Sequence, residues 1–389
     1  MRIVLVMPEV PLPFGHASAR WYYVLLKGLV ERGHDVVAFA SSGDPEQIAC
    51  ARQSFPRPGY DLRCYSHPRR SGLRAKWETL RQPFAYNFGP ELRADLREEL
   101  AAGFDVLHLE QIWSGWLAPA GCRRKSVLVV HNLYTLDQAP ASFFRWRTRL
   151  LQNGEKRVLA RCPNILAHTS RVAAAVRERA PQSLIGVIPL ALDSSLYPFV
   201  PAAARTGEPT VLLVGAMDWY PSYSAAVRLL TRLWPRIKAR VPQAKLQIVG
   251  WNARRALQLW LGRPDVEIHE NVPSTQLFFE RCGVLLYAPE YGTGVKIKTL
   301  EAFAYGLPLV TNGYGVEGVP AEDGVHADIA EDDNSLVDRT VKLLEDPNRQ
   351  ERQRVEARRL LELYCAPKTV LAQLEGCYAG ILHAKQAMP

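Results

Sequence analysis

The chain of 389 residues is 48% hydrophobic and 22% charged, so it is too apolar to be disordered and too long for one typical core, and two domains are expected. Its formal net charge of +9 favours anionic partners such as nucleotide diphosphates or phospholipid surfaces, whereas no recognised module points to nucleic acid. The seven cysteines are scattered without a CxxC pair, which argues against a disulfide framework and a zinc site and fits a reducing cytosol.

Short apolar segments alternate with helical ones in the first half of the chain. The expected elements are strands over 3–7, 35–40, 105–109, 126–130 and 165–168, and helices over 18–32 and 144–160. Such alternation is typical of a parallel, doubly wound sheet. Because the first strand opens the chain, no leader is expected, and no apolar run reaches the ~20 residues of a membrane span.

A Pro- and Ala-rich segment over 188–209 predicts an interdomain connection. A second alternating unit follows it. Its expected elements are strands over 210–215, 246–250, 266–269, 284–288 and 307–311, and helices over 335–344, 350–361 and 369–385. Neither half carries a GxGxxG motif after a strand, which argues against a nicotinamide dehydrogenase.

The stretch over 288–318, APEYGTGVKIKTLEAFAYGLPLVTNGYGVEG, joins a strand end, a glycine-bearing loop and a helix expected over 295–305. Gly306 and Pro308 supply the stop signal of this helix. The free N–H groups of a first helical turn and the helix dipole both favour phosphate. The sequence therefore predicts an anion site near Gly294.

One face of this helix carries the side chains expected to meet a nucleotide. Gly294, Lys298, Glu301 and Tyr305 follow i, i+4, i+7, i+11 spacing. Lys298 would place its ammonium on a phosphate. Glu301 would lie roughly 9 Å along the helix axis, a distance that suits a carboxylate accepting two ribose hydroxyls. An exposed i, i+3 ion pair between Lys298 and Glu301 is the alternative.

The segment GVKIKTLEAFAYGLPLVTNGYGVEGV resembles the nucleotide-sugar signature of the family-4 glycosyltransferases of GT-B fold, most closely the bacterial branch with a basic residue and Lys before LEA. The segments 211–250 and 3–40, and the strand that ends in His131-Asn132, are also similar to that family. The resemblance implies an α/β protein with two Rossmann-like, doubly wound domains that face a central cleft. An acceptor domain would span 1–188 and be joined by the C-terminal helix, about 369–389, and a nucleotide-sugar donor domain would span 189–368.

The resemblance also implies a set of donor-binding residues, in addition to Lys298: Gly15, Gly215, Asp218, Thr293, Gly294, Val295, Lys296, Glu301 and Glu317. The family often carries Arg and Lys just after the strand-ending glycine, but this chain reads Ala216-Met217-Asp218 there. Either Lys298 and Lys296 replace the usual clamp, or phosphate binding is weak in this chain. Lys298 is the first candidate, because it shares a helix face with Glu301, and Lys296 is either a second clamp residue or merely solvated.

Many family members have two glutamates eight residues apart, and Glu301 is the second of that pair. The position of the first is occupied by Thr293, which would act as an N-cap and leave sugar recognition to the backbone of the Gly292–Gly294 loop. Glu317 would reach the ribose or base, and an exposed turn carboxylate without a role is the alternative.

Two histidines of the first half are candidates for the reaction. The loop containing Gly15 and His16 precedes the first long helix, and His16 would contact the acceptor or a phosphate or act as a base, although a solvent-exposed histidine without a role is as good an interpretation. His131 ends an apolar strand, and ligands of open α/β sheets lie at the carboxyl ends of strands. The resemblance places His131 beside the donor sugar, and a structural, hydrogen-bonded histidine is the alternative.

Two basic stretches, over 67–81 and 145–161, interleave Arg with Trp and Leu, as interfacial segments do. A solvated helix face is the alternative for each stretch. Together they suggest contact with an anionic or lipid-linked acceptor, or with anionic lipid itself.

The expected function is transfer of a sugar from a nucleotide-diphosphate donor to a hydroxyl acceptor, which would be a glycan, a lipid-linked molecule or a small molecule. The resemblance implies retention of anomeric configuration. Positive groups would offset the charge on the departing diphosphate, which requires neither a metal nor a cofactor. The expected location is the cytoplasm or the inner face of the membrane. The rivals are a non-catalytic nucleotide-sugar-binding protein, because the usual clamp is missing, and a sugar-nucleotide epimerase.

Overall fold

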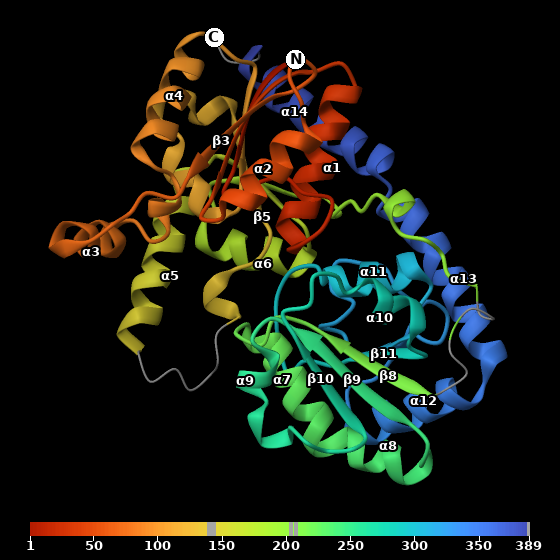
Figure 1. Ribbon diagram of the computed structural model, residues 1–389. Helices are drawn as coiled ribbons and strands as arrows, with labels where there is room; N and C mark the ends of the chain where they lie inside the picture. Colours follow the sequence, from red (N-terminus) through yellow and green to blue (C-terminus); the bar gives the residue numbers. More distant parts are fainter. Residues whose placement is uncertain (138–144, 202–204, 206–208, 387–389) are drawn as a thin grey trace. The chain divides into compact units, whose positions relative to one another are not determined.

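The computed structural model describes residues 1–137, 145–201, 205 and 209–386, and the chain divides into two compact units (Figure 1). Unit 1 comprises Met1–Thr135, Pro140–Leu192 and Pro367–Pro389, and unit 2 comprises Leu136–Ala139 and Asp193–Ala366. Parts of the segment 188–209, the expected helix start at 144 and the last three residues lie outside the described residues. No helix in the described part of the chain is long and apolar enough to cross a membrane.

Unit 1 is built on a seven-stranded parallel sheet in the order β3-β2-β1-β4-β5-β6-β7. Its strands are β1 (Arg2–Met7), β2 (Asp35–Ser42), β3 (Asp61–Ser66), β4 (Val106–Glu110), β5 (Ser126–Val130), β6 (Asn164–Ala167) and β7 (Leu184–Val187). The sequence missed β3 and β7. Both are edge strands with largely solvent-accessible side chains, so neither shows the continuous apolar run of a strand that is buried on both faces.

The helices of unit 1 are α1 (Ala17–Glu31), α2 (Pro45–Ser54), α3 (Gly72–Arg81), α4 (Pro90–Ala101), α5 (Arg145–Leu159), α6 (Ser170–Arg179) and α14 (Pro367–Gln386). They pack around this sheet, except for α3, which projects away from it with Leu73 and Trp77 exposed (Figure 1). α14 packs closely on α1, because a methyl group at Gly28 would lie 2.1 Å from Leu371 Cδ1. Glu375 of α14 also accepts hydrogen bonds from Arg32 Nε at 2.9 Å and from His34 at 2.7 Å.

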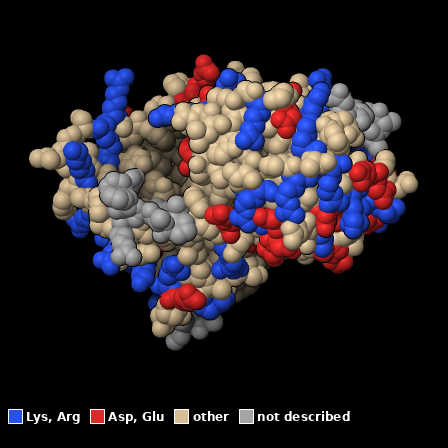
Figure 2. Space-filling view, turned by 90° about the horizontal axis from the view of Figure 1, so that it is seen from below, with Lys and Arg blue, Asp and Glu red and all other residues tan. Residues whose placement is uncertain are grey.

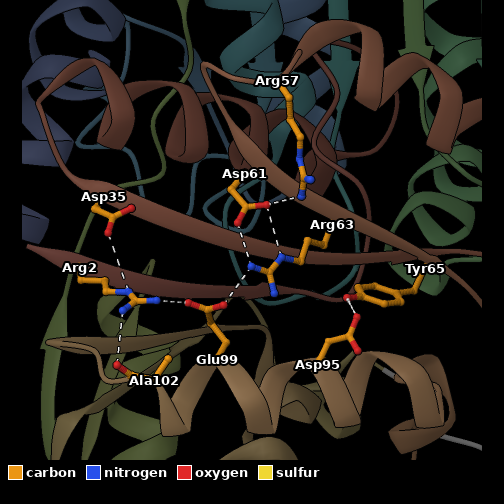
Figure 3. Close-up of polar contacts among 9 residues, drawn as sticks. All are labelled: Arg2, Asp35, Arg57, Asp61, Arg63, Tyr65, Asp95, Glu99 and Ala102. Atoms are coloured by element: carbon orange, nitrogen blue, oxygen red, sulfur yellow. Dashed lines mark hydrogen bonds and ion pairs between the residues drawn. The ribbon is translucent and has the colours of Figure 1, made fainter.

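A chain of ion pairs ties β3 to α4 and β1 (Figure 3). Glu99 of α4 is buried and bridges the guanidinium groups of Arg2 and Arg63, the latter at 2.9 Å. Arg63 also pairs with Asp61 at 2.9 Å. β3 pairs with β2 along its whole length, and these charges compensate one another where its polar side chains meet α4 and β1.

Unit 2 repeats the arrangement with a six-stranded parallel sheet in the order β10-β9-β8-β11-β12-β13. Its strands are β8 (Thr210–Val214), β9 (Lys245–Gly250), β10 (Val266–Glu270), β11 (Val284–Tyr287), β12 (Leu309–Thr311) and β13 (Asp328–Ile329). Its helices are α7 (Tyr220–Arg228), the π-helical segment η7 (Leu229–Leu233), α8 (Trp234–Arg240), α9 (Ala253–Ala256), α10 (Gln276–Arg281), α11 (Ile297–Tyr305), α12 (Asp333–Glu345) and α13 (Pro347–Tyr364).

Both sheets reverse their strand order at one point, between β1 and β4 in unit 1 and between β8 and β11 in unit 2. In open α/β sheets ligands bind outside the carboxyl ends of the strands at such a point. The prediction of two doubly wound, Rossmann-like domains is confirmed. Ligand-binding residues are therefore expected in the loops that follow β1, β4 and β5 in unit 1 and β8 and β11 in unit 2.

Candidate functional site

The helix that follows the loop after β11 begins later than the sequence predicted. α11 starts at Ile297, and its N-cap is Lys296, whose backbone is extended (φ −95°, ψ 102°). Gly294 adopts a left-handed backbone with φ 76°, so it stands outside the helix. The predictions that Gly294 belongs to the polar helix face and that Thr293 caps the helix are therefore wrong. Glu301 lies four residues beyond Ile297, about 6 Å along the axis rather than 9 Å.

Lys298 is buried at the carboxyl end of β8. Its Nζ donates a hydrogen bond to Ser222 Oγ at 3.0 Å and lies 3.9 Å from the centroid of the Tyr287 ring. A methyl group at Gly215 would lie 2.7 Å from this Nζ and 2.5 Å from Ser222 Oγ. Only glycine at 215 lets the ammonium and the hydroxyl come this close to the strand end, so the structure brings Gly215 and Lys298 together as the sequence suggested.

The surroundings of Lys298 disfavour its charge. Burial and, to a smaller extent, the charge of Lys296 lower its pKa from 10.5 to about 7, and the nearby carboxylate of Glu301 only partly opposes these effects. Glu301 itself is 4% exposed. A cation that is costly to keep charged in this unit would be stabilised by an anion, and perturbed lysines of this kind are frequent at functional sites.

Lys296 does not project into solvent, which corrects the interpretation of it as a merely solvated residue. It is 8% exposed, and its ammonium donates hydrogen bonds to the carbonyl oxygens of Thr293 at 3.0 Å and Gly294 at 2.5 Å. It therefore braces the loop after β11 and adds positive charge near Lys298.

Protein carboxylates already occupy two N–H groups of this loop. Asp137 Oδ1 accepts hydrogen bonds from the Thr293 N–H at 2.6 Å and from Thr293 Oγ1 at 2.8 Å. Glu317 Oε1 accepts a hydrogen bond from the Gly294 N–H at 3.2 Å. The carboxylate that the sequence lacks at position 293 is thus supplied in space by Asp137. A diphosphate would be repelled from these oxygens, so the loop suits hydroxyl groups and the Lys298 side of the site suits phosphate.

Replacing Asp137 by alanine should leave the buried Thr293 N–H without its acceptor. Such a loss costs about 1–3 kcal/mol, so we expect a lower melting temperature for unit 2 and weaker donor binding, both measurable by thermal shift. Asp137→Asn retains an oxygen acceptor and is the matched control. Equal losses in the two variants would show that charge rather than the hydrogen bonds holds the loop.

Two of the other predicted residues of unit 2, Asp218 and Val295, are peripheral. Asp218 is exposed in the loop after β8, and Val295 is half-buried before α11. Glu317 is half-buried and bonded to the loop, which does not agree with an exposed turn carboxylate. The donor candidates that the structure gathers closely are Gly215, Thr293, Gly294, Lys296, Lys298 and Glu317, with Glu301 one turn along α11.

In unit 1, His131 follows β5, and its side chain is 12% exposed. Its Nε2 lies 2.5 Å from Oε2 of Glu110, the last residue of the neighbouring strand β4. Gly15 and His16 lie exposed before α1, where His16 is the N-cap without a side-chain capping bond. The structure thus embeds His131 in a polar network and leaves His16 in solvent.

Sequence reasoning missed the partners of these residues. Ser222 and Asp137 meet α11 and its loop across 76 and 156 positions of the chain, and no local pattern announces such contacts. Glu110 did have a signal. It ends a strand, and its neighbour in the sheet, β5, leads directly to His131, so the two side chains could have been assigned to one edge of the sheet.

Comparison with known proteins agrees with this fold. Residues 18–196 match the model for Glycosyltransferase Family 4, and residues 208–346 match the model for Glycosyl transferases group 1. A search of curated proteins found no match.

Several solved structures share the architecture. Sucrose-phosphate synthase from Thermosynechococcus elongatus has a TM-score of 0.74 and 17% identity, covering 98% of this chain and 99% of that one. HepE of Anabaena in complex with UDP has a TM-score of 0.67 and 14% identity, covering 98% and 100%. WaaG, a glycosyltransferase involved in lipopolysaccharide biosynthesis, has a TM-score of 0.65 and 15% identity, covering 94% and 98%.

Identities this low show the fold, and the two family matches, which together span most of the chain, add the activity. The chain is a glycosyltransferase of GT-B fold that resembles the bacterial branch of family 4.

Proposed function

We propose that this enzyme transfers a sugar from a nucleoside diphosphate donor to a hydroxyl acceptor with retention of configuration, without a metal or a cofactor. The observation that carries the proposal is the buried Lys298 ammonium, which is held by Ser222 at the end of β8 and has its pKa lowered to about 7 by burial. The negative charge of a bound diphosphate would stabilise the protonated form of Lys298, which burial disfavours.

Each part of the site has a role in this proposal. Lys298 would offset the charge that grows on the departing diphosphate, and such preorganised charge is usually the largest catalytic contribution. Glu301 would accept hydrogen bonds from ribose hydroxyls. The loop containing Thr293, with the Asp137 carboxylate upon it, would meet hydroxyls of the sugar. In unit 1, His131 would contact the transferred sugar.

A thermal-shift screen tests the donor. Wild type and Glu301→Ala would be heated with UDP, GDP, dTDP, ADP and their common sugar conjugates, because a ligand raises the melting temperature by mass action. UDP is the first choice, because the HepE structure holds it. We expect one diphosphate to stabilise wild type and not Glu301→Ala, while the exposed control Glu345→Ala behaves as wild type. No shift with any diphosphate would contradict the proposal.

Retention is tested separately, once the donor is known. Proton NMR of the product identifies the anomer, and an inverted product would overturn this part of the proposal. Transfer in the presence of EDTA tests independence from metal ions, and loss of activity would contradict it.

The acceptor side of unit 1 suggests contact with anionic lipid. Trp77 on α3 and Trp146 on α5 are 58% and 61% exposed. They border hollows of about 570 and 780 Å³, the first lined by Arg69, Arg70, Arg81, Arg93 and Arg97. Figure 2 shows Lys and Arg along its left edge, over these two helices, with few Asp or Glu among them. Exposed indole rings among basic side chains suit a phospholipid surface.

Liposome sedimentation tests this surface. We expect binding to vesicles with anionic lipid, little binding to neutral ones, and loss of binding in the Trp77→Ala/Trp146→Ala double variant. Trp251→Ala removes a similarly exposed indole of unit 2 (54%) and serves as the control. Equal partitioning of the protein between the two kinds of vesicle would overturn the proposal.

A further inference from the structure

A buried polar network surrounds the histidine of unit 1. Glu110 is fully buried, and its carboxylate meets three nitrogen atoms: Trp21 Nε1 at 2.9 Å, His108 Nε2 at 2.7 Å and His131 Nε2 at 2.5 Å. The second ring nitrogen of His108, Nδ1, lies 2.5 Å from the hydroxyl of Tyr378. Tyr378 is fully buried and belongs to α14, so the network joins three separate elements to the strand end of β4.

The positions of the protons in this network follow from its chemistry. Burial alone would raise the pKa of Glu110, but electrostatic attraction to the His131 ring and the hydrogen bonds from His108 and His131 outweigh burial and hold that pKa well below its usual range. The carboxylate is therefore ionised and can only accept, so both histidines present an Nε2–H to it. Burial raises the pKa of Tyr378, so its hydroxyl stays protonated and donates a hydrogen bond to His108 Nδ1.

The ring of His131 is fixed in orientation as well as in tautomer. It packs edge-on against His168, with centroids 4.7 Å apart, and edge-on against Tyr22 at 5.9 Å. Burial lowers the pKa of His168 to about 3, so this neighbour is neutral and adds no positive charge. With Nε2 directed to Glu110, Nδ1 lies on the other side of Cε1 and is directed away from that carboxylate, and His131 is the partly exposed member of a network whose other histidines are buried.

We propose that Glu110 is a positioning residue for His131: with His108 and Tyr378 it fixes the Nε2–H tautomer, so that Nδ1 can accept a hydrogen bond from a hydroxyl of the transferred sugar. This inference rests on the proposed function for its catalytic consequence, but not for the tautomer. It also makes α14 part of the machinery, because Tyr378 determines which nitrogen of His108 carries the proton.

The first experiment is ¹⁵N NMR of the histidine side chains, which reports the tautomer without any substrate. His131 is assigned by its disappearance in His131→Gln. We expect the Nε2–H tautomer at His131 in wild type and a mixture of tautomers in Glu110→Gln, because the amide must turn an N–H toward one of its neighbours. An unchanged tautomer in the folded variant would overturn the inference, even if donor binding and turnover are confirmed.

The second experiment measures turnover as release of nucleoside diphosphate from the donor identified by thermal shift. We expect Glu110→Gln to lower kcat by about 10- to 100-fold, as loss of an orienting partner commonly does, with KM for the donor within about twofold. Glu110→Asp should recover part of kcat. Tyr378→Phe, which leaves the carboxylate intact, should lower kcat several-fold and alter its pH profile.

Glu99→Gln is the matched control, because Glu99 is another buried carboxylate of unit 1, paired with Arg2 and Arg63 (Figure 3). We expect it to lower the melting temperature and leave kcat unchanged. An equal loss of kcat in Glu99→Gln and Glu110→Gln, or wild-type kcat in folded Glu110→Gln and Tyr378→Phe, would reduce Glu110 to a structural residue. If wild type fails to bind any donor, the proposed function fails, while the tautomer measurement still decides this inference.

Discussion

Lys298→Met is expected to abolish most of the transferase activity while making the ligand-free protein more stable. Removing one preorganised group that stabilises charge in the transition state lowers kcat by about 10²–10³-fold. The same ammonium destabilises the folded protein before the donor binds, because Lys298 is 9% exposed and burial lowers its pKa from 10.5 to about 7. A methionine of similar length avoids this desolvation, which is on the order of a few kcal/mol. Turnover and thermal melts of the two proteins measure both effects.

The pH dependence gives an independent signature of Lys298. The unfolded chain holds the lysine proton up to about pH 10.5 and the folded chain only up to about 7. Between these values the unfolded state binds more protons, so the stability of the ligand-free wild type rises with pH relative to the methionine variant. Donor affinity moves the opposite way. A diphosphate prefers the protonated lysine, so its Kd should rise by up to about tenfold per pH unit above 7.

Lys342→Met, on the exposed face of α12, is the control and should change neither quantity. Calorimetric titration of the diphosphate between pH 6.5 and 9 would show the slope in wild type and in the control. A Lys298→Met protein that binds the diphosphate as tightly as wild type, or a wild type without the slope, would exclude Lys298 as the phosphate anchor.

Gly250→Ala is expected to destabilise unit 2 more than any other change considered. An added methyl group would lie 1.7 Å from the carbonyl oxygen of Gly215. That carbonyl belongs to main chain that cannot retreat, because the Gly215 N–H bonds to Val249 O at 3.0 Å. Side chains can rotate away from an added methyl but this backbone cannot, so we expect a loss above about 4 kcal/mol, at the diagnostic end of point mutations. Urea unfolding of the purified protein would measure it.

Gly262→Ala separates crowding from backbone strain in the same unit. Gly262 has a φ of +82° but open space around its Cβ position, so its replacement should cost only about 1–2 kcal/mol for the left-handed backbone. Similar losses in the two variants would mean that the main chain around Gly215 yields more easily than its hydrogen bond implies.

The interior strands could be read from the sequence because each is buried on both faces. β5, SVLVV, has the predicted bounds, and all five of its residues are buried. The strands that were missed carry little apolar signal: β3 pairs with β2 along its backbone and makes ion pairs to Glu99 through Arg63, and β13 has two residues. Whether these edge strands pair depends on neighbours that are distant in sequence. The local hydrophobic periodicity of the segment therefore does not predict them.

The candidate site was predictable in its members but not in its internal contacts. The pattern around Lys298 and Glu301 identified the helix, yet a start at Ile297 instead of 295 moved Gly294 out of it. The same shift in the helix start explains why Lys296 is not solvated. Lys296 precedes the helix as its N-cap, and its ammonium turns back to the carbonyl oxygen of Gly294. Asp137 could not be anticipated at all, because it approaches Thr293 from a segment 156 positions earlier.

The place of α14 in the chain has a consequence for synthesis in the cell. Unit 1 begins at Met1 but takes its last helix from residues after Pro367, so the ribosome makes all of unit 2 before unit 1 can be completed. Until Tyr378 has left the exit tunnel, His108 lacks the hydroxyl that it meets in the finished protein, and Gly28 lacks the helix that covers it. Domains generally fold in the order in which they are made. In this chain we expect the second unit to reach its native state first, and the first unit to spend the interval with part of its core open to chaperones.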